Sequence, residues 1–347
     1  MNIRQSLIRS MAGIASDGGL VTIYEKMKAS RLASQTRILD YHRVSPERAS
    51  WTTSVPLHPV LFEWQLGYIK RRFHVMGLDN LLDYLVSDRT LPPNGAIVTF
   101  DDGYKDNYLY SVPLLKKYEI PATFFLTTGP IDNGELHWFD ELAYSIQYSR
   151  RAILEIEGFG VLSLGIRQRE REAAVSSIVR YLRQLPPMAR DRVLVEIRRQ
   201  TGMAIPDDLS RRVMLNWEDA RDMIRAGFRI GAHTVTHAVL TAGSSEEAKM
   251  EISESKKILE NRLQLDVRMF SYPFGQYNAE IIETVKASGY LAAVTTVPKL
   301  VDRKTDPYKL SRVLPGWDPQ SFRLFTSGLF SDVYSAYELV RFPQRQR

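Results

Sequence analysis

The hydrophobic pattern of this chain alternates between short, continuous apolar runs and longer segments with helical spacing. The apolar runs are rich in β-branched and aromatic residues and are too short for helices, so they predict buried strands. These expected strands span 37–44, 96–100, 121–128, 228–233, 269–275, 290–296 and 310–314. Between them, apolar residues recur every three or four positions, which is the spacing of one helical face. The expected helices span 60–73, 78–85, 108–118, 217–226, 246–263 and 279–288. This alternation is typical of a parallel α/β sheet.

The segment 131–212 interrupts that alternation. It contains a hairpin pattern over 154–164 and basic amphipathic helices between 168 and 200, so it predicts an inserted, mostly helical subdomain. The arginines of these helices favour a solvated helix face, with an anionic-ligand surface as the alternative. The remaining regions are an N-terminal helical region over 1–36, the α/β domain over 37–130 and 213–318, and a C-terminal helix and tail over 319–347.

The composition narrows the class of protein. Of 347 residues, 44% are hydrophobic and 25% are charged, as in globular proteins with a sizeable core. The chain has no cysteine, which excludes disulfides and thiolate metal sites, so a transition metal would be held by His, Asp or Glu. The net charge of +6 comes without a Lys/Arg block or zinc-finger spacing, so we expect no nucleic-acid partner.

The sequence also carries expectations about location. It has no run of about 18 apolar residues, and its first residues lack the uninterrupted apolar core of a secretory signal, so we expect a cytoplasmic protein. The stretch 12–24 is interrupted by Asp17, Gly18 and Gly19 and favours a short helical region that lies on a membrane surface. Peripheral membrane association is therefore part of the expectation, whereas the pattern specifies no oligomeric state.

Two adjacent carboxylates, Asp101 and Asp102, directly follow the expected strand 96–100, and Gly103 lets the backbone turn after them. In parallel α/β folds, ligands and chemistry lie at the C-terminal ends of the strands. Neighbouring acids repel each other, so the pair needs a cation, a shared proton or full solvation. On its own, an Asp-Asp-Gly sequence is more often a solvated turn.

A second polar pair, His233 and His237, follows another expected strand. Neutral imidazoles bind divalent metals through one ring nitrogen, and two of them four residues apart converge on one ion when the backbone takes a helical turn. One carboxylate and two histidines make an open three-ligand site. The second carboxylate is then free to act as a general base on water, so the two pairs together predict metal-assisted hydrolysis.

Three motifs occur in order along the chain: Thr99-Phe-Asp-Asp-Gly103, His233-Thr-Val-Thr-His237 and Tyr272-Pro-Phe-Gly275. They resemble the motifs of the polysaccharide deacetylase family, the NodB-homology or family 4 carbohydrate esterases, and the resemblance covers about 37–130 and 213–315. It implies an α/β fold, a distorted (β/α) barrel of the NodB-homology type with a mostly helical insertion. It also implies one divalent metal ion, commonly zinc, and hydrolysis of an N-acetyl group on an amino-sugar carbohydrate with release of acetate.

The resemblance assigns roles residue by residue. Asp102, His233 and His237 would bind the metal, and Asp101 would be the base. The third motif is the expected substrate and oxyanion site: the backbone N–H of Tyr272, which precedes Pro273, would help to hold the oxyanion.

The chain departs from the family pattern at two places. Ser271 stands where many members have an arginine that steadies the base, and Arg268 is the candidate replacement. No histidine follows His237, although many members carry a C-terminal leucine-histidine motif that supplies the general acid. The branch that resembles poly-N-acetylglucosamine deacetylases has this histidine in an N-terminal Tyr-His strand, which Tyr41-His42 resembles. Since the departing amine needs a proton donor, we expect His42 to be the acid.

Two other functions stay open. A catalytically silent carbohydrate-binding module would use the same fold without turnover. An O-acetyl esterase or a deformylase would use the same metal site on a different bond. The expected cytoplasmic location favours a lipid-linked or nucleotide-linked amino sugar of cell-surface polysaccharide synthesis over a finished wall polymer.

Overall fold

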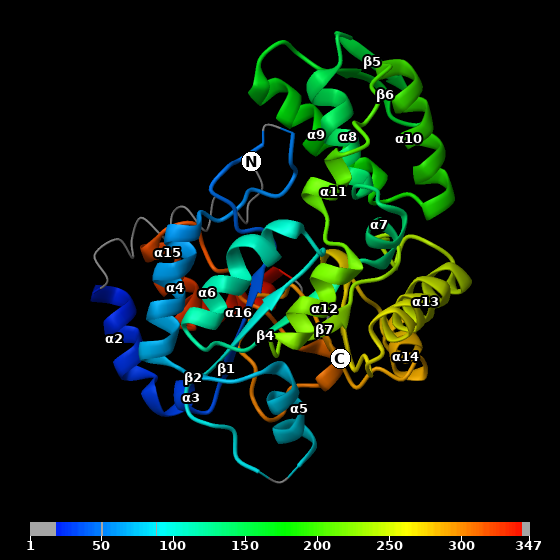
Figure 1. The fold of residues 1–347 in the computed structure, drawn as a ribbon. Coiled ribbons are helices and arrows are strands. Elements are labelled where there is room, and N and C mark those ends of the chain that lie inside the picture. Colours follow the sequence, from blue (N-terminus) through cyan, green and yellow to red (C-terminus); the bar gives the residue numbers. More distant parts are fainter. Residues whose placement is uncertain (1–18, 50, 88, 342–347) are drawn as a thin grey trace.

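A parallel sheet of seven strands forms the centre of the structure (Figure 1). The computed structural model describes residues 19–49, 51–87 and 89–341. The strands are β1 (Thr36–Tyr41), β2 (His74–Val75), β3 (Gly95–Phe100), β4 (Ala122–Leu126), β7 (Arg229–Ala232), β8 (Met269–Ser271) and β9 (Ala292–Val294). Their order is β1-β3-β4-β7-β8-β9, and β2 pairs with the start of β3. All pairings between these strands are parallel, as the strand–helix alternation predicts.

The segment between Leu310 and Val313 closes this curved sheet into a barrel. The Leu310 N–H donates to the Ala293 carbonyl (3.0 Å), and the Val313 N–H donates to the Ile38 carbonyl (2.8 Å). The closing segment therefore joins β9 to β1. The expected strand over 310–314 is corrected to two isolated bridges, because each neighbour pairs with this segment at one point only. The prediction of a distorted (β/α) barrel is confirmed.

Helices cover the outside of the barrel. They are α4 (Pro59–Arg72), α5 (Leu78–Val86), α6 (Val112–Lys117), α12 (Trp217–Arg225), α13 (Ser245–Leu263), α14 (Ala279–Ala287), α15 (Pro319–Thr326) and α16 (Leu329–Arg341), with a π-helical turn η1 (Asn107–Ser111) and 3-10 turns η2 (Pro273–Gly275) and η3 (Pro307–Lys309). Local signals set their ends: Ser244 and Glu247 form a reciprocal capping box at the start of α13. The single expected C-terminal helix is two helices, because Gly328 has a left-handed φ of 86° between them.

The expected N-terminal helical region is described from residue 19 onward. It contains α2 (Gly19–Met27) and α3 (Ala29–Ala33), whereas residues 1–18 and the end of the expected tail, 342–347, lie outside the described residues. Helix α2 exposes Leu20, Ile23 and Met27. Across the described part of the chain, no helix combines the length and the apolarity needed to cross a membrane. The expected cytoplasmic location and membrane-surface contact stay predictions.

The segment 131–212 has a hydrophobic core of its own, separate from the two clusters that line the barrel sheet. It contains α8 (Trp138–Tyr148), the hairpin β5 (Ile153–Ile156) and β6 (Gly160–Ser163), α9 (Gln168–Leu182), α10 (Pro187–Thr201) and α11 (Leu209–Val213), and α7 (Thr128–Asn133) leads into it from β4. In Figure 1 these elements, drawn in green, stand above one end of the barrel. The interface between insertion and barrel adjoins the polar residues described next.

Candidate active site

Side chains on the inner face of the barrel change from apolar to polar towards the carboxyl ends of the strands. Alternate residues of a strand share a face. The apolar inner positions include Ile38, Ile97, Phe125, Met269, Val294 and Leu310. Two or four residues further along the same faces stand Asp40, Asp101, Ser271 and Arg312, all of them buried. The carboxyl end of the barrel is therefore a buried polar site, at the position where parallel α/β folds place their chemistry.

Asp102, His233 and His237 meet at this end of the barrel. The Oδ1 atom of Asp102 lies 3.2 Å from Nε2 of His237 and 3.5 Å from Nε2 of His233. One ligand atom from each residue lies within 4.8 Å of the others, and all three side chains are buried. The structure thus brings together the three residues that the sequence predicts as metal ligands.

The chemistry of these three side chains fits a divalent cation. Nδ1 of His233 lies 2.8 Å from the Ser271 carbonyl, which only an Nδ1–H can satisfy, so in the neutral ring the lone pair is on Nε2, the nitrogen that faces Asp102. This is the arrangement that fixes metal-binding histidines. Oδ1 of Asp102 is buried and has no hydrogen-bond partner among the described residues. A buried carboxylate oxygen that faces two imidazole nitrogens is stabilised when a cation occupies the space between them.

Glu251, on α13, holds the loop that carries the two histidines. One of its carboxylate oxygens accepts the backbone N–H groups of Val235 and Thr236 at 2.8 and 2.9 Å, and the other accepts the Thr236 hydroxyl at 2.6 Å. The carboxylate is buried, so it acts as an anionic cap on the turn between His233 and His237. Glu251 belongs to none of the three sequence motifs.

Replacing Glu251 by alanine should weaken metal binding about 10- to 100-fold, because the turn that aims both imidazoles loses three hydrogen bonds. Competition with a chelator of known affinity measures the change. Glu251→Gln should recover much of the affinity, since an amide can serve both backbone N–H groups with its oxygen. Glu254→Ala, on the exposed side of α13, is the matched control, and an equal loss in that variant would contradict the assignment.

Left-handed backbone is concentrated around the predicted metal ligands. Asp102, Thr234, His237 and Phe274 have φ angles of 79°, 66°, 56° and 57°. Such conformations cost free energy in residues other than glycine and persist only where surrounding contacts impose them. One such contact is His137, whose Nε2 lies 3.1 Å from the Asp102 carbonyl. Burial lowers the pKa of His137 to about 4, so the ring is neutral and its Nε2–H donates to that carbonyl.

Asp101 is held by an arginine that the sequence analysis missed. The Arg312 guanidinium binds both Asp101 oxygens, at 2.8 and 2.6 Å, in a bidentate pair. It also contacts Asp40 at 3.0 Å, and its Nε donates to the Thr295 carbonyl at 3.0 Å. Burial opposes ionisation of Asp101, but the charge and hydrogen bonds of Arg312 outweigh it and lower the pKa of Asp101 to about 2. Asp101 is therefore a carboxylate throughout the neutral range.

Arg312 occupies the role for which Arg268 was the candidate. Arg268 lies on the surface, 4.0 Å from Asp266 and away from Asp101. The expectation that Arg268 replaces the missing arginine is therefore corrected. The short side chain of Ser271 leaves room for the guanidinium, and its hydroxyl donates to Asp101 at 3.0 Å. An arginine inside the apolar run Leu310-Ser-Arg-Val-Leu314 is the signal that could have found it, because a buried cation requires an acidic partner.

His42 lies beside Asp40 and Asp101, one residue beyond the end of β1. Its Nδ1 is 3.8 Å from Asp40, its side chain is 36% exposed, and Asp40, His42 and Asp101 form a second close cluster. Burial alone would lower the pKa of His42, but the carboxylates of Asp40, Asp102 and Asp101 raise it above its ordinary value. The amide of Asn107, in the π-helical turn η1, donates to the His42 carbonyl at 2.9 Å and fixes the strand exit.

The third motif does not offer the expected oxyanion donor. The Tyr272 N–H donates to the Val294 carbonyl at 3.1 Å, because the register of β8 on β9 continues one residue beyond β8. This N–H is therefore committed to the sheet, and the expectation is corrected. Pro273 is buried at the start of η2. Phe274 of this motif packs its ring edge-on against His237, with the ring centroids 4.7 Å apart.

Comparison with known proteins supports the interpretation of the three motifs. The sequence profile of the polysaccharide deacetylase family matches residues 88–166 and 188–293, which include the aspartate pair, the histidine pair and the third motif. YxkH of Bacillus subtilis (strain 168), a polysaccharide deacetylase by name, is 23% identical over 247 residues. That match covers 71% of this chain and 61% of YxkH, so the chain spans less than two thirds of this relative.

Solved structures share the fold. The Streptococcus pyogenes deacetylase PplD in complex with acetate superposes with a TM-score of 0.57 at 18% identity, covering 85% of this chain and 98% of PplD. IcaB from Ammonifex degensii superposes with a TM-score of 0.55 at 20% identity, covering 85% and 97%. At these sequence identities, the comparison shows that the fold is shared. Because the family profile covers more than half of the sequence, on both sides of the insertion, this chain belongs to the polysaccharide deacetylase family.

Proposed function

We propose that this protein is a metal-dependent hydrolase that removes N-acetyl groups from an amino-sugar glycan or glycan precursor. The observation that carries the proposal is the buried Asp102–His233–His237 triad beside an ionised Asp101. Family membership supports a carbohydrate substrate and a metal-dependent reaction. The donor set of two imidazoles and one carboxylate, without thiolates, suits zinc among the divalent ions.

A divalent ion bound by the triad would polarise the acetamide carbonyl and make water more acidic. Asp101 would take the proton from the attacking water, because it is ionised and its two oxygens are oriented by Arg312 and Ser271. His42, with a raised pKa, would supply a proton to the departing amine from the opposite side of the site.

Acetate release tests the proposal directly. Metal-chelated and zinc-restored protein should be assayed in parallel on N-acetylated glucosamine oligomers, their lipid- or nucleotide-linked precursors, and O-acetyl and N-formyl analogues. We expect acetate only from the metal-restored protein, and only from N-acetyl substrates. Faster cleavage of the ester or the formamide would replace the N-deacetylase with the esterase or deformylase. Absence of both turnover and bound metal would favour a silent carbohydrate-binding module.

Replacing His42 by glutamine should lower kcat on an N-acetyl substrate about 100-fold, because the amine would depart without a proton donor. The wild-type rate should fall as the pH rises through the raised pKa of His42, since the protonated form is the donor. That descending limb should be absent in the variant. An aryl acetate, whose leaving group needs no proton, should be cleaved at nearly the wild-type rate.

His74→Gln provides the control, because His74 is exposed on β2, remote in sequence from the three motifs. It should behave like the wild type on both substrates. Equal losses on amide and aryl ester in His42→Gln would assign His42 to packing rather than to proton donation.

A further inference from the structure

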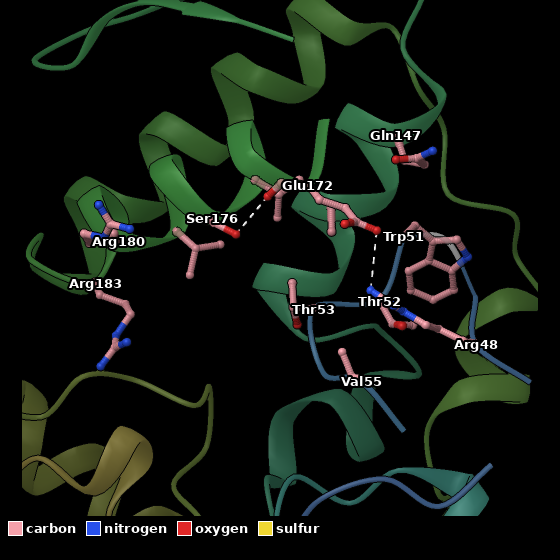
Figure 2. Close-up of a pocket in the computed structure, with 13 residues that line it drawn as sticks. Arg48, Trp51, Thr52, Thr53, Val55, Gln147, Glu172, Ser176, Arg180 and Arg183 are labelled. Carbon is pink, nitrogen blue, oxygen red and sulfur yellow. Dashed lines mark hydrogen bonds and ion pairs between the residues drawn. The ribbon is translucent and has the colours of Figure 1, made fainter. Parts of the chain in front are cut away.

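A cavity of about 440 Å³ lies between the 48–55 loop, described at residues 48, 49 and 51–55, and the insertion helices α8 and α9 (Figure 2). Its polar lining includes Arg48, Thr53, Glu172, Ser176, Arg180 and Arg183. Figure 2 shows Arg180 and Arg183 on one side of this space and Arg48 on the other. Neither the family motifs nor the proposed mechanism uses any of these residues.

The wall formed by Arg183 reaches the metal ligands through one aromatic ring. The Arg183 guanidinium stacks 3.8 Å from the centre of the Phe274 ring, and that ring packs 4.7 Å from His237. The guanidinium is therefore separated from a predicted metal ligand by the thickness of a single side chain. A substrate whose acetamido group reached the triad would bring its neighbouring groups close to Arg183.

The opposite wall is tied to the first motif. The Thr53 hydroxyl donates to one carboxylate oxygen of Asp140 at 2.9 Å, and the Tyr104 hydroxyl donates to the other at 2.6 Å. Tyr104 directly follows the turn made by Gly103, so the 48–55 loop is anchored to the same strand exit as the base. Contacts through Phe274 on one wall and Asp140 on the other therefore link the cavity to the candidate site.

The charge of the cavity is unbalanced. Three arginines face it, and the single acidic residue in its lining, Glu172, lies 3.4 Å from Arg48. Arg180 and Arg183 have no acidic partner among the described residues, and Nε of Arg183 is buried without a hydrogen-bond acceptor. A partly buried guanidinium without an acceptor is costly, and its planar fork is suited to phosphate or carboxylate oxygens. The walls that hold it are built from packed helices rather than from a loose surface loop.

We propose that Arg180 and Arg183 bind an oxyanion carried by the substrate next to the N-acetylated sugar. The proposal rests on the proposed deacetylase function and narrows its substrate class to acidic amino-sugar compounds. Phosphate and carboxylate share the required chemistry. The phosphate would belong to a nucleotide- or lipid-linked precursor, and the carboxylate would belong to a uronic acid in an acidic glycan.

Matched ligands test this assignment. Di-N-acetylchitobiose, its 1-phosphate and a disaccharide of glucuronic acid and N-acetylglucosamine should be titrated calorimetrically into metal-loaded Asp101→Asn protein, in which turnover is suppressed. We expect at least one acidic ligand to bind about tenfold tighter than neutral chitobiose, as charge-assisted hydrogen bonds allow. A larger gain from the 1-phosphate identifies a phosphate-linked precursor, and a larger gain from the uronate identifies an acidic glycan.

Charge-removing variants locate the effect. Arg183→Gln combined with Arg180→Gln should abolish the preference for the acidic ligand while leaving the affinity for neutral chitobiose within about twofold. Arg183→Lys should restore part of the preference. Arg169→Gln, on the exposed first turn of α9, is the control and should keep the full preference. Equal affinities for acidic and neutral ligands in the parent protein, or a preference that survives the double variant, would overturn the proposal.

This binding readout does not depend on acetate release. A protein that binds acidic ligands through Arg180 and Arg183 but releases no acetate would refute the deacetylase and retain the oxyanion site. A protein that deacetylates neutral oligomers without any preference for charged ligands would support the deacetylase and refute the oxyanion site. In wild-type turnover, the double variant should raise KM for the acidic substrate and leave kcat nearly unchanged, because the bound group lies beyond the reacting bond.

Discussion

Asp101→Asn protein should bind its metal with full stoichiometry and yet release acetate about a thousandfold more slowly than the wild type. An amide cannot accept the proton from the attacking water, and general bases contribute roughly 10²- to 10⁴-fold to such reactions. The metal triad keeps all three of its members, because the base is not one of them. Arg312 keeps Asp40 as an acidic partner at 3.0 Å, so the variant should remain folded. Metal content by elemental analysis and acetate by a coupled assay give the two readouts.

His237→Ala is the matched comparison, because it removes a ligand and spares the base. Its metal content should fall to near zero under conditions in which Asp101→Asn remains loaded. Wild-type turnover by Asp101→Asn would refute the assignment of the base, and stoichiometric metal in His237→Ala would count against its role as a ligand.

Replacing Arg312 by methionine should destabilise the protein by about 3–5 kcal/mol and abolish turnover. The change leaves two buried carboxylates, Asp40 and Asp101, without their shared cation, and breaking a buried ion pair from one side costs about this much. Their pKa values should rise, because burial is then opposed by less positive charge. Denaturant unfolding measures the stability, and acetate release measures the activity.

Arg268→Met controls for the loss of one arginine near the third motif. Arg268 is 40% exposed and makes only a long contact to Asp266, so its replacement should change stability by no more than about 0.5 kcal/mol. Similar behaviour of the two variants would show that the Arg312 contacts contribute little. Arg312→Met combined with Asp40→Asn and Asp101→Asn should recover part of the lost stability, because no buried charge is then left unpaired.

The pattern of apolar runs predicted the parallel sheet well for a physical reason, whereas the barrel was implied by the family resemblance. Strands of a parallel sheet are buried on both faces, so their sequences are continuous apolar runs. These runs end where polar side chains are tolerated. The same rule placed Asp101 and His233 at strand exits, and shared strand direction brought them to one end of the barrel. Local sequence was sufficient because each of these residues is positioned by its own strand.

Arg312 and the Tyr272 N–H could not be predicted in this way. Arg312 reaches Asp101 across 211 residues, and the apolar run that carries it predicts a strand but not which acidic residue its one cation would meet. The Tyr272 N–H is used by the register of β8 on β9, which is set by tertiary packing rather than by local sequence. Glu251 could not be predicted either. In the sequence, a buried glutamate of α13 cannot be distinguished from the exposed glutamates of the same amphipathic helix.

The position of the closing segment, far along the chain from its acidic partners, also affects how this protein folds during synthesis. During synthesis, Asp40 and Asp101 leave the ribosome more than two hundred residues before their counter-ion. Until Arg312 arrives, the two carboxylates keep their hydration, which opposes closure of an apolar barrel around them. Closure of the barrel therefore requires contacts between residues far apart in the sequence, as in other folds dominated by non-local pairing. A nascent chain that ends before residue 310 holds every predicted metal ligand but lacks the cation that steadies Asp101, so the proposed hydrolysis would have to wait until Arg312 has been synthesised.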